Sequence, residues 1–127
     1  MRSIINNNKI ATTDILISAE GILPEIAVLK AIRPSYLLDS EGKRTDKVDF
    51  IRYECANPTD FSNFTLKVLS TKQIITEEEL EDATEVVYVK IPLNEVIIKP
   101  YKIEYGTAAV SITVPRIQLV TNSKEVK

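Results

Sequence analysis

The alternation of side chains in residues 47–56, KVDFIRYECA, constrains the fold of this chain more than any other feature. Successive side chains of a strand point to opposite faces, so Ile51, Tyr53 and Cys55 share one face, which we expect to lie in a core. The opposite face carries Val48, Phe50, Arg52 and Glu54. A core does not explain the ring of Phe50, and its use is the first question that the sequence raises.

Five further segments are rich in β-branched and aromatic residues and are bounded by polar residues, which is typical of strands. They lie at 26–38, 63–70, 85–91, 95–106 and 107–120. Gly42 suits a polar hairpin loop between the first two strands, and Asn57 with Pro58 suits the next turn. Pro100 and Pro115 mark bends or strand edges, because proline donates no hydrogen bond to a sheet. The chain is therefore predicted to be mostly β.

The most acidic part of the chain has the pattern of a helix N-terminus. Its acidic residues, with no basic residue between them, are Glu77, Glu78, Glu79, Glu81, Asp82 and Glu85. Thr76 is placed to act as the N-cap, with Glu79 completing a capping box. Ile75 and Leu80 occupy the positions of a hydrophobic staple. We therefore expect a short helix at about 77–84 and interpret the acidic cluster as its solvent-exposed surface rather than as a binding patch.

Three strands, one short helix and further strands follow in the order of an OB-fold, a five-stranded Greek-key barrel with its helix between strands 3 and 4. We predict one such domain at 14–120, a mobile N-terminal segment at 1–13 and a flexible tail at 121–127. A β-sandwich or another small barrel is the alternative, because a strand count alone does not determine whether a sheet closes. Residues 14–25 are compatible with either a strand or a helical turn.

Catalytic chemistry finds little support in the composition. The chain has no His and one Cys, which excludes Ser-His-Asp triads, Cys-His pairs and His-based zinc sites. The acidic string that begins at Asp39 departs from a calcium loop, because Lys43 and Arg44 stand where oxygen ligands are required. Cys55 has no partner for a disulfide and is interpreted as a small buried hydrophobic residue. We therefore expect no enzymatic activity, no metal and no cofactor.

The outward faces of the predicted strands combine aromatic rings with cations. In the neighbouring strands, the more apolar set, assigned to the core, is Phe64, Leu66, Val68, Val87, Val89 and Ile91. The outward set is Phe50, Arg52, Lys67, Tyr88 and Lys90, with Lys43 and Arg44 at the hairpin tip and, as further candidates, Lys30, Arg33 and Tyr36. Rings stack on bases, at ~1–3 kcal/mol each, and Lys and Arg contact phosphates, so this pattern favours a surface for single-stranded nucleic acid.

Two considerations bear on this surface. The net charge of −2 does not oppose it, because removing the six acidic residues around the helix from the total of 18 leaves 12 against 16 basic ones. The exposed rings have an alternative use, which is to cover a strand edge or to form a dimer contact. A register slip of one residue would exchange the core and surface sets, so the assignment depends on strand register.

The run KAIRPSYLLDSEGKRTDKVDFIRYECANPTDFSNFTLKV, followed by ITEEELEDATEVVYVKI and KPYKIEYGTAAVSITVPRIQLV, resembles small OB-fold single-stranded-DNA-binding or replication-associated proteins of Gram-positive phages and conjugative plasmids. The resemblance covers about residues 26–120 and lies in the order of the predicted elements and in short similar segments, not in an invariant motif. It implies a non-catalytic protein that coats exposed strands during replication or transfer and associates with itself or with replication or recombination proteins. The chain lacks Trp and the acidic, Gly-rich tail of cellular single-strand-binding proteins, which puts tetramer formation and tail-mediated recruitment in question.

The leading hypothesis is a single-stranded-DNA-binding protein with little sequence preference. Its predicted contacts are base stacking by Phe50 and Tyr88, phosphate contacts by Arg52, Lys67 and Lys90, and a clamp formed by Lys43 and Arg44. No apolar run reaches the ~18 residues of a membrane span and the polar start has no signal-peptide pattern, so we expect a cytoplasmic protein without membrane contacts. The alternative is an accessory or adaptor protein of a mobile element, whose exposed rings form a protein interface.

Overall fold

The computed structural model describes residues 5–11 and 19–120. In chain order the strands are β1 (Lys9–Ala11), β2 (Ile26–Leu38), β3 (Arg44–Ala56), β4 (Asn63–Val68), β5 (Tyr88–Lys90), β6 (Ile97–Glu104), β7 (Thr107–Val114) and β8 (Gln118–Leu119). The helices are α1 (Ala19–Ile22), α2 (Glu77–Asp82) and the 3₁₀-helix η2 (Leu93–Glu95). None of the helices in these two ranges has the length and apolar character needed to cross a membrane.

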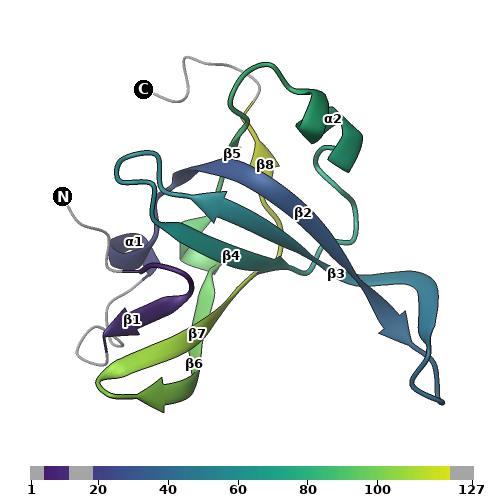
Figure 1. Cartoon of the computed structure of the whole chain (residues 1–127), viewed down its shortest axis with the longest axis horizontal. Coiled ribbons are helices and arrows are strands. Elements are labelled where there is room, and N and C mark those ends of the chain that lie inside the picture. The colour runs from purple at the N-terminus through teal and green to yellow at the C-terminus, as the bar shows by residue number, and fades with distance from the viewer. Residues whose placement is uncertain (1–4, 12–18, 121–127) are drawn as a thin grey trace.

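The eight strands of the described residues belong to one sheet. Their hydrogen-bonded order is β1-β7-β4-β3-β2-β5-β8, and β6 pairs with β7. Strands β2, β3 and β4 form an antiparallel meander, and β4 pairs with β7 in parallel. The β2–β3 hairpin and the β6–β7 hairpin project from opposite sides of the molecule (Figure 1).

The mostly β fold and the short helix between the third and fourth predicted strands are confirmed. The predicted strand at 26–38 matches β2, and the one at 47–56 begins three residues earlier, at Arg44. The count of five strands is wrong, because the described residues form eight. The segment at 107–120 ends its first strand before Pro115 and resumes as β8, as expected where proline withholds a backbone N–H.

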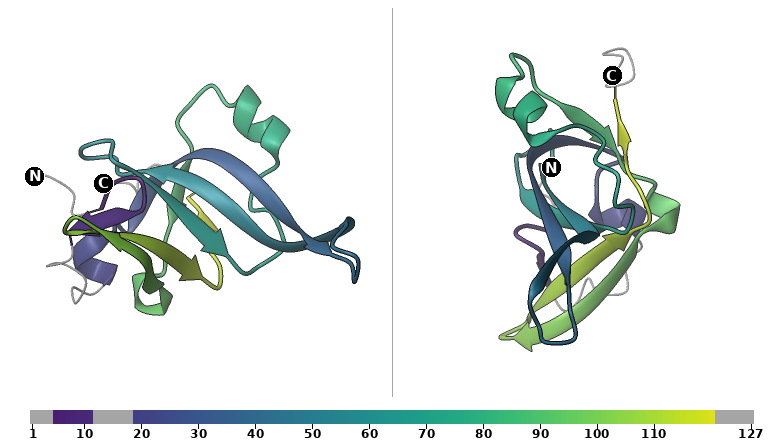
Figure 2. Two further views of the ribbon diagram at one scale, coloured as in Figure 1. Left: turned by 60° about the horizontal axis from the view of Figure 1, so that its bottom comes forward. Right: turned by 90° about the vertical axis from the view of Figure 1, so that its right-hand side faces the viewer.

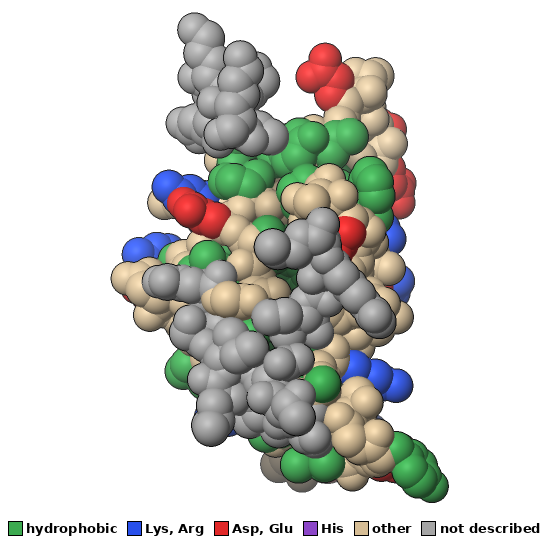
Figure 3. All heavy atoms as spheres, turned by 90° about the vertical axis from the view of Figure 1, so that its left-hand side faces the viewer, with side chains coloured by type: hydrophobic (Ala, Val, Ile, Leu, Met, Phe, Trp, Pro, Cys, Tyr) green, Lys and Arg blue, Asp and Glu red, His purple; other side chains and the backbone are tan. Residues whose placement is uncertain are grey.

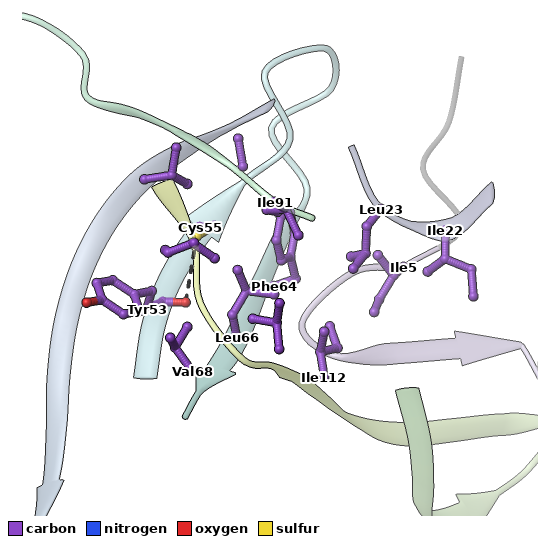
Figure 4. Packing of buried hydrophobic residues seen from close by; sticks show 14 of the residues in the cluster. Ile5, Ile22, Leu23, Tyr53, Cys55, Phe64, Leu66, Val68, Ile91 and Ile112 are labelled. Carbon is purple, nitrogen blue, oxygen red and sulfur yellow. Dashed lines mark hydrogen bonds between the residues drawn. The ribbon is translucent and has the colours of Figure 1, made fainter. Parts of the chain in front are cut away.

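The predicted core face is confirmed. Ile51, Tyr53 and Cys55 of β3 have exposed fractions of 0%, 0% and 1%. The predicted apolar faces of the neighbouring strands are also buried at Phe64, Leu66, Val68, Val89 and Ile91, and Val87 packs partly against them. Figure 4 shows these β3 and β4 side chains converging on one interior, with Ile5, Ile22 and Leu23 closing one end of it. From Phe50 to Cys55, the alternation on which the outward face depends is therefore the predicted one.

One outward assignment on β3 is wrong, because the strand contains a bulge. Phe50 pairs with Ser35, but the next residue of β2, Tyr36, pairs with Val48, so Asp49 is an extra residue on β3. A bulge interrupts the alternation of side chains. Val48 accordingly packs against the core instead of sharing the face of Phe50. Tyr36, which pairs with Val48, follows it to the side opposite Phe50.

The N-cap predicted for the acidic helix is confirmed. Thr76 is the N-cap of α2, and its Oγ1 accepts a hydrogen bond from the Glu79 backbone N–H at 3.1 Å. The hydroxyl in turn donates to Glu79 Oε1 at 3.0 Å. Ile75 and Leu80 are partly buried against the core, as the staple requires. The helix ends at Asp82, two residues before the predicted end.

The asparagine-rich N-terminal segment enters the sheet. Ile5 and Ile10 are 1% and 2% exposed, and β1 pairs with the first residues of β7. The mobility predicted for 1–13 stays a prediction, and part of that segment, like the tail predicted at 121–127, lies outside the described residues. Within residues 5–11, the side chains of Ile5 and Ile10 form part of the core.

Candidate nucleic-acid interface

Three of the predicted site residues form one cluster on the outer face of β3 and β4. Arg52 and Lys67 are directly paired across the two strands. The Arg52 guanidinium lies 4.8 Å from the centre of the Phe50 ring, and the Lys67 Nζ lies 4.4 Å from it. Cation–π contacts of this kind stabilise by ~0.5–1 kcal/mol each at exposed sites. We call Phe50, Arg52 and Lys67 the ring–cation cluster.

A groove of about 510 Å³ begins at this cluster and runs across β4 toward β7. Arg52, Lys67 and Thr65 line its side on β3 and β4, and Asn8 and Tyr101 line it from the N-terminal segment and β6. A second hollow of about 300 Å³ shares Asn7 and Thr65 with the groove and extends toward Lys30 on β2. The outer face of β3, β4 and β7 therefore offers two adjoining hollows that share lining residues and have cations at their edges.

The groove exists because β4 and β7 diverge, and an asparagine side chain fills the fork between them. The two strands pair only at Lys67 with Thr113 and Val68 with Val114. Farther along β4, the Asn8 side chain accepts from the Thr65 backbone N–H at 2.6 Å and donates to the Thr65 carbonyl at 3.0 Å. The Asn8 carbonyl accepts from the Val110 backbone N–H of β7 at 2.8 Å. Asn8 thus bridges both strands where their direct pairing ends.

Ion pairing separates the predicted cations into two groups. Lys43 lies 3.7 Å from Glu41, Lys90 lies 3.6 Å from Glu25, and the candidate Arg33 lies 2.8 Å from Glu54. No ion pair within residues 5–11 and 19–120 involves the two cations of the ring–cation cluster. Those two side chains are held by a ring, not by a carboxylate, so an incoming anion meets their charge without competition from an ion pair among the described residues. The same holds for Arg44, whose guanidinium lies over the Tyr36 ring, and for Lys30, which donates to Asn63 Oδ1.

The hairpin residues lie on a separate arm. Lys43 and Arg44 are at the far end of the β2–β3 hairpin, which extends well beyond the rest of the sheet (Figure 2). The Arg44 guanidinium lies 4.0 Å above the centre of the Tyr36 ring. Asp39 holds the turn, because its Oδ1 accepts from the backbone N–H groups of Glu41 and Lys43 at 2.9 and 2.8 Å. The acidic string at the tip is thus an ordinary hairpin turn.

Tyr88 and Lys90 lie away from the ring–cation cluster. Tyr88 of β5 pairs with Val28 at the start of β2, whereas Phe50 pairs with Ser35 near the other end of that strand. Seven residues of extended chain span roughly 20 Å, so the two rings do not act on the same one or two nucleotides. The structure therefore divides the predicted surface into the ring–cation cluster, the hairpin arm and the β5 pair.

Two residues beside the groove were not predicted, Tyr101 and Lys99 of β6. The exposed fraction of Tyr101 is 70%. Lys99 pairs with Ser111, which lines the groove, so the two side chains share a face. Sequence alternation missed both because Pro100 hides the period of this strand and a bulge follows it.

The acidic helix lies away from this surface, and the end of the molecule near β1 shows no cluster of visible cations (Figures 1 and 3). Helix α2 lies beside β2, whereas the groove lies on the other side of the sheet order, between β4 and β7 (Figures 1 and 2). The acidic helix is therefore remote from the groove. On the face that carries β1 and α1, the visible basic side chains stand apart from one another (Figure 3). The cations placed at the groove are thus Arg52 and Lys67 of the ring–cation cluster, with Lys99 on the β6 side and Lys30 at the adjoining hollow.

Cys55 has the environment of an inert thiol. Its exposed fraction is 1%, and its Sγ–H donates to the Tyr53 carbonyl at 3.7 Å. Burial raises the pKa of the Cys55 thiol to about 12. Since the thiolate is the nucleophile, this group has no catalytic use near neutral pH. The interpretation of Cys55 as a small buried hydrophobic residue is confirmed.

Protein-family models, curated proteins and solved structures were compared with the chain, and none of them matches it. A function has to be inferred from the residues of the chain itself.

Proposed function

We propose that this protein binds single-stranded DNA with little sequence preference and carries out no catalysis. The observation that supports this most strongly is the ring–cation cluster, in which Arg52 and Lys67 stand at the edge of a groove of about 510 Å³ and have no carboxylate partner in the part of the chain that the structure describes. Sequence-independent binding to a single strand needs cations that follow the backbone and rings on which bases stack. Both are present on one face.

The proposed architecture is an OB-like, partly open barrel. Strands β7 and β8 pair with β4 and β5, at opposite ends of the run β4-β3-β2-β5, and only residues 115–117 separate them in the chain. A sheet whose two ends pair with one nearly continuous segment has to curve back on itself, which supports closure. In OB-folds the face of strands 2 and 3 binds oligonucleotides, and the ring–cation cluster lies on the corresponding strands, β3 and β4.

The proposed setting is the replication or transfer of a phage or plasmid, in the cytoplasm, with self-association or contacts to replication or recombination proteins. This part of the proposal rests on the resemblance of residues 26–120 to replication-associated proteins of such elements. Single-strand coating there requires affinity for any sequence, and the cluster offers backbone and stacking contacts in place of base-edge readout.

A titration of fluorescein-labelled oligo-dT, followed by anisotropy at several salt concentrations, tests the proposed function. Wild type should bind, with an affinity that falls as salt rises. The double variant Arg52→Ala/Lys67→Ala should bind more weakly, and the slope of log K against log salt should become shallower by about 1.4, since each phosphate contact to a single strand contributes about 0.7.

A matched control is the double variant Lys43→Ala/Lys90→Ala, which removes the same formal charge from two cations that already have carboxylate partners. Its slope should change by less than half as much. Absence of salt-dependent binding in wild type would refute DNA binding. Equal losses in the two double variants would show that net charge, not the ring–cation cluster, determines affinity.

The second candidate function is an adaptor that acts through protein contacts. The β6–β7 hairpin favours it, because Tyr101, Ile103 and Tyr105 are 70%, 60% and 102% exposed. Exposed apolar side chains concentrated on one hairpin are typical of an interaction surface. Light scattering separates the two functions: a stable oligomer that protects this hairpin and does not bind oligo-dT would support the adaptor.

A further inference from the structure

The ring of Phe50 is poorly available for base stacking. It is partly buried, and two cations already lie within 5 Å of its centre, at 4.8 and 4.4 Å. A base that stacks there has to displace a cation and lose ~0.5–1 kcal/mol for each contact broken. Base stacking provides ~1–3 kcal/mol, so loss of one contact would offset roughly a third of its gain and loss of both roughly two thirds, and each displaced cation would leave its place at the groove.

Tyr101 presents the ring that Phe50 does not. It lines the same groove as Arg52 and Lys67, and its exposed fraction is 70%. Its position results from a bulge: β6 pairs Pro100 with Val110 and Lys102 with Ala109, which leaves Tyr101 without a partner on β7. Bulges re-aim a side chain at a sheet edge. Here the bulge places a tyrosine at the groove, across it from β3 and β4.

Pro100, next to this bulge, is tolerated in β6 without loss of a hydrogen bond. The Val110 backbone N–H donates to the Asn8 carbonyl, away from β6, so the Val110–Pro100 pair is not one that exchanges ladder hydrogen bonds. The missing N–H of proline therefore costs no hydrogen bond at this position. Lys99, immediately before Pro100, adds a cation on the groove face.

We propose that Tyr101 is the base-stacking residue of the groove and that Phe50 is a positioning residue, which holds Arg52 and Lys67 for phosphate contacts. This assignment rests on the proposed function and specifies its site. A single strand would pass between the ring–cation cluster and β6. One of its bases would stack on Tyr101, and its phosphates would face Arg52 and Lys67 on one side and Lys99 on the other. Tyr88 and Lys90 lie outside this path.

Tryptophan fluorescence tests the assignment in the full chain, because the chain contains no Trp. Tyr101→Trp places a reporter in the groove, and Tyr105→Trp places a matched reporter on the turn of the same hairpin, where the native side chain is fully exposed. Addition of oligo-dT should quench the Tyr101→Trp emission, since stacked bases quench indole, and should leave the Tyr105→Trp emission unchanged.

Affinity measurements complete the test. Tyr101→Ala should weaken oligo-dT binding by about 5- to 150-fold with an unchanged salt slope, and Tyr101→Phe should retain wild-type affinity, since stacking needs the ring and not the hydroxyl. Phe50→Leu should instead make the salt slope shallower, because the cations lose their support. A purely structural role of Phe50 would lower thermal stability without changing the slope.

The outcomes for the two proposals differ. Failure of wild type to bind oligo-dT would refute the proposed function. Wild-type binding together with unquenched Tyr101→Trp and undiminished affinity of Tyr101→Ala would overturn the assignment of Tyr101 and leave DNA binding standing. Circular dichroism of each variant checks that the exposed substitutions have not altered the fold.

Discussion

The bridge formed by Asn8 in the fork between β4 and β7 leads to a quantitative prediction. The Asn8 side chain makes two hydrogen bonds to the Thr65 backbone, at 2.6 and 3.0 Å, in a partly buried position. Each is worth ~1 kcal/mol net, and removal of the amide leaves both Thr65 groups without their present partner. Asn8 also has φ of 56°, a left-handed conformation that asparagine tolerates and alanine does not.

Two substitutions separate these contributions. Asn8→Gly removes both side-chain hydrogen bonds but accepts the left-handed backbone, so the free energy of unfolding should fall by ~2 kcal/mol. Asn8→Ala removes the same bonds and adds backbone strain of ~1 kcal/mol, for a loss of ~3 kcal/mol. The control is Asn94→Ala, at an exposed asparagine of η2, which should change stability by less than ~0.5 kcal/mol.

Urea unfolding at 25 °C, followed by circular dichroism, gives the three free energies by linear extrapolation. The order Ala below Gly below wild type is expected. If both Asn8 variants unfold within ~0.5 kcal/mol of wild type, the amide does not bridge the two strands. If Gly and Ala are equally harmful, the left-handed backbone at this position contributes nothing, and only the hydrogen-bond part of the reasoning survives.

Two further predictions concern the buried thiol and the β6–β7 turn. Burial raises the pKa of the Cys55 thiol from 9.0 to about 12, so the folded state holds this proton more tightly than the unfolded state. The free energy of unfolding should therefore be level below pH ~9. From there toward pH ~12 it should fall by about 1.4 kcal/mol per pH unit. Urea unfolding at a series of pH values should show a free energy of unfolding that depends less on pH in Cys55→Ala than in wild type. An identical pH dependence would contradict the assigned burial. Burial also raises the pKa of the Tyr53 phenol, which lowers the free energy of unfolding only above pH ~10. Gly106→Ala should lower stability by ~1 kcal/mol in thermal unfolding, because its φ is 79°. No atom lies within 4 Å of the added Cβ, so this loss comes from the backbone conformation and not from a clash. Tyr105→Asn, at φ of 49°, should be neutral or stabilising. A neutral Gly106→Ala would mean that the turn is not left-handed.

Local chemistry explains which features could be predicted from the sequence. The faces of β3 follow from its period of two, and burial at Ile51 and Tyr53 bears this out. The start of α2 follows from Thr76 and Glu79, which interact three residues apart. The β2–β3 loop follows from Gly42, whose φ is 81°. Each of these depends only on residues close in the chain.

The site was predicted in composition and not in arrangement. The outward positions of Phe50, Arg52 and Lys67 followed from alternation, but their contacts depend on the pairing of Arg52 with Lys67 across two strands. The carboxylates that accompany Lys43 and Lys90 were not anticipated. The distance of roughly 20 Å between the β5 pair and Phe50 was also not predicted, because the sequence of one strand does not determine which strands lie next to it in the sheet.

The sequence by itself determined that the chain forms strands with one apolar face each, joined by a capped acidic helix, because periodicity, capping and turn conformation are set within a few residues. The tertiary structure alone decided the bulges at Asp49 and Tyr101, the insertion of Asn8 between β4 and β7, and therefore which cations meet at the groove. A bulge or a bridging amide exists only relative to a partner strand, and the partners lie from 7 to 57 residues away in the chain. Side chains far apart in the sequence thus become neighbours only when the whole sheet has formed.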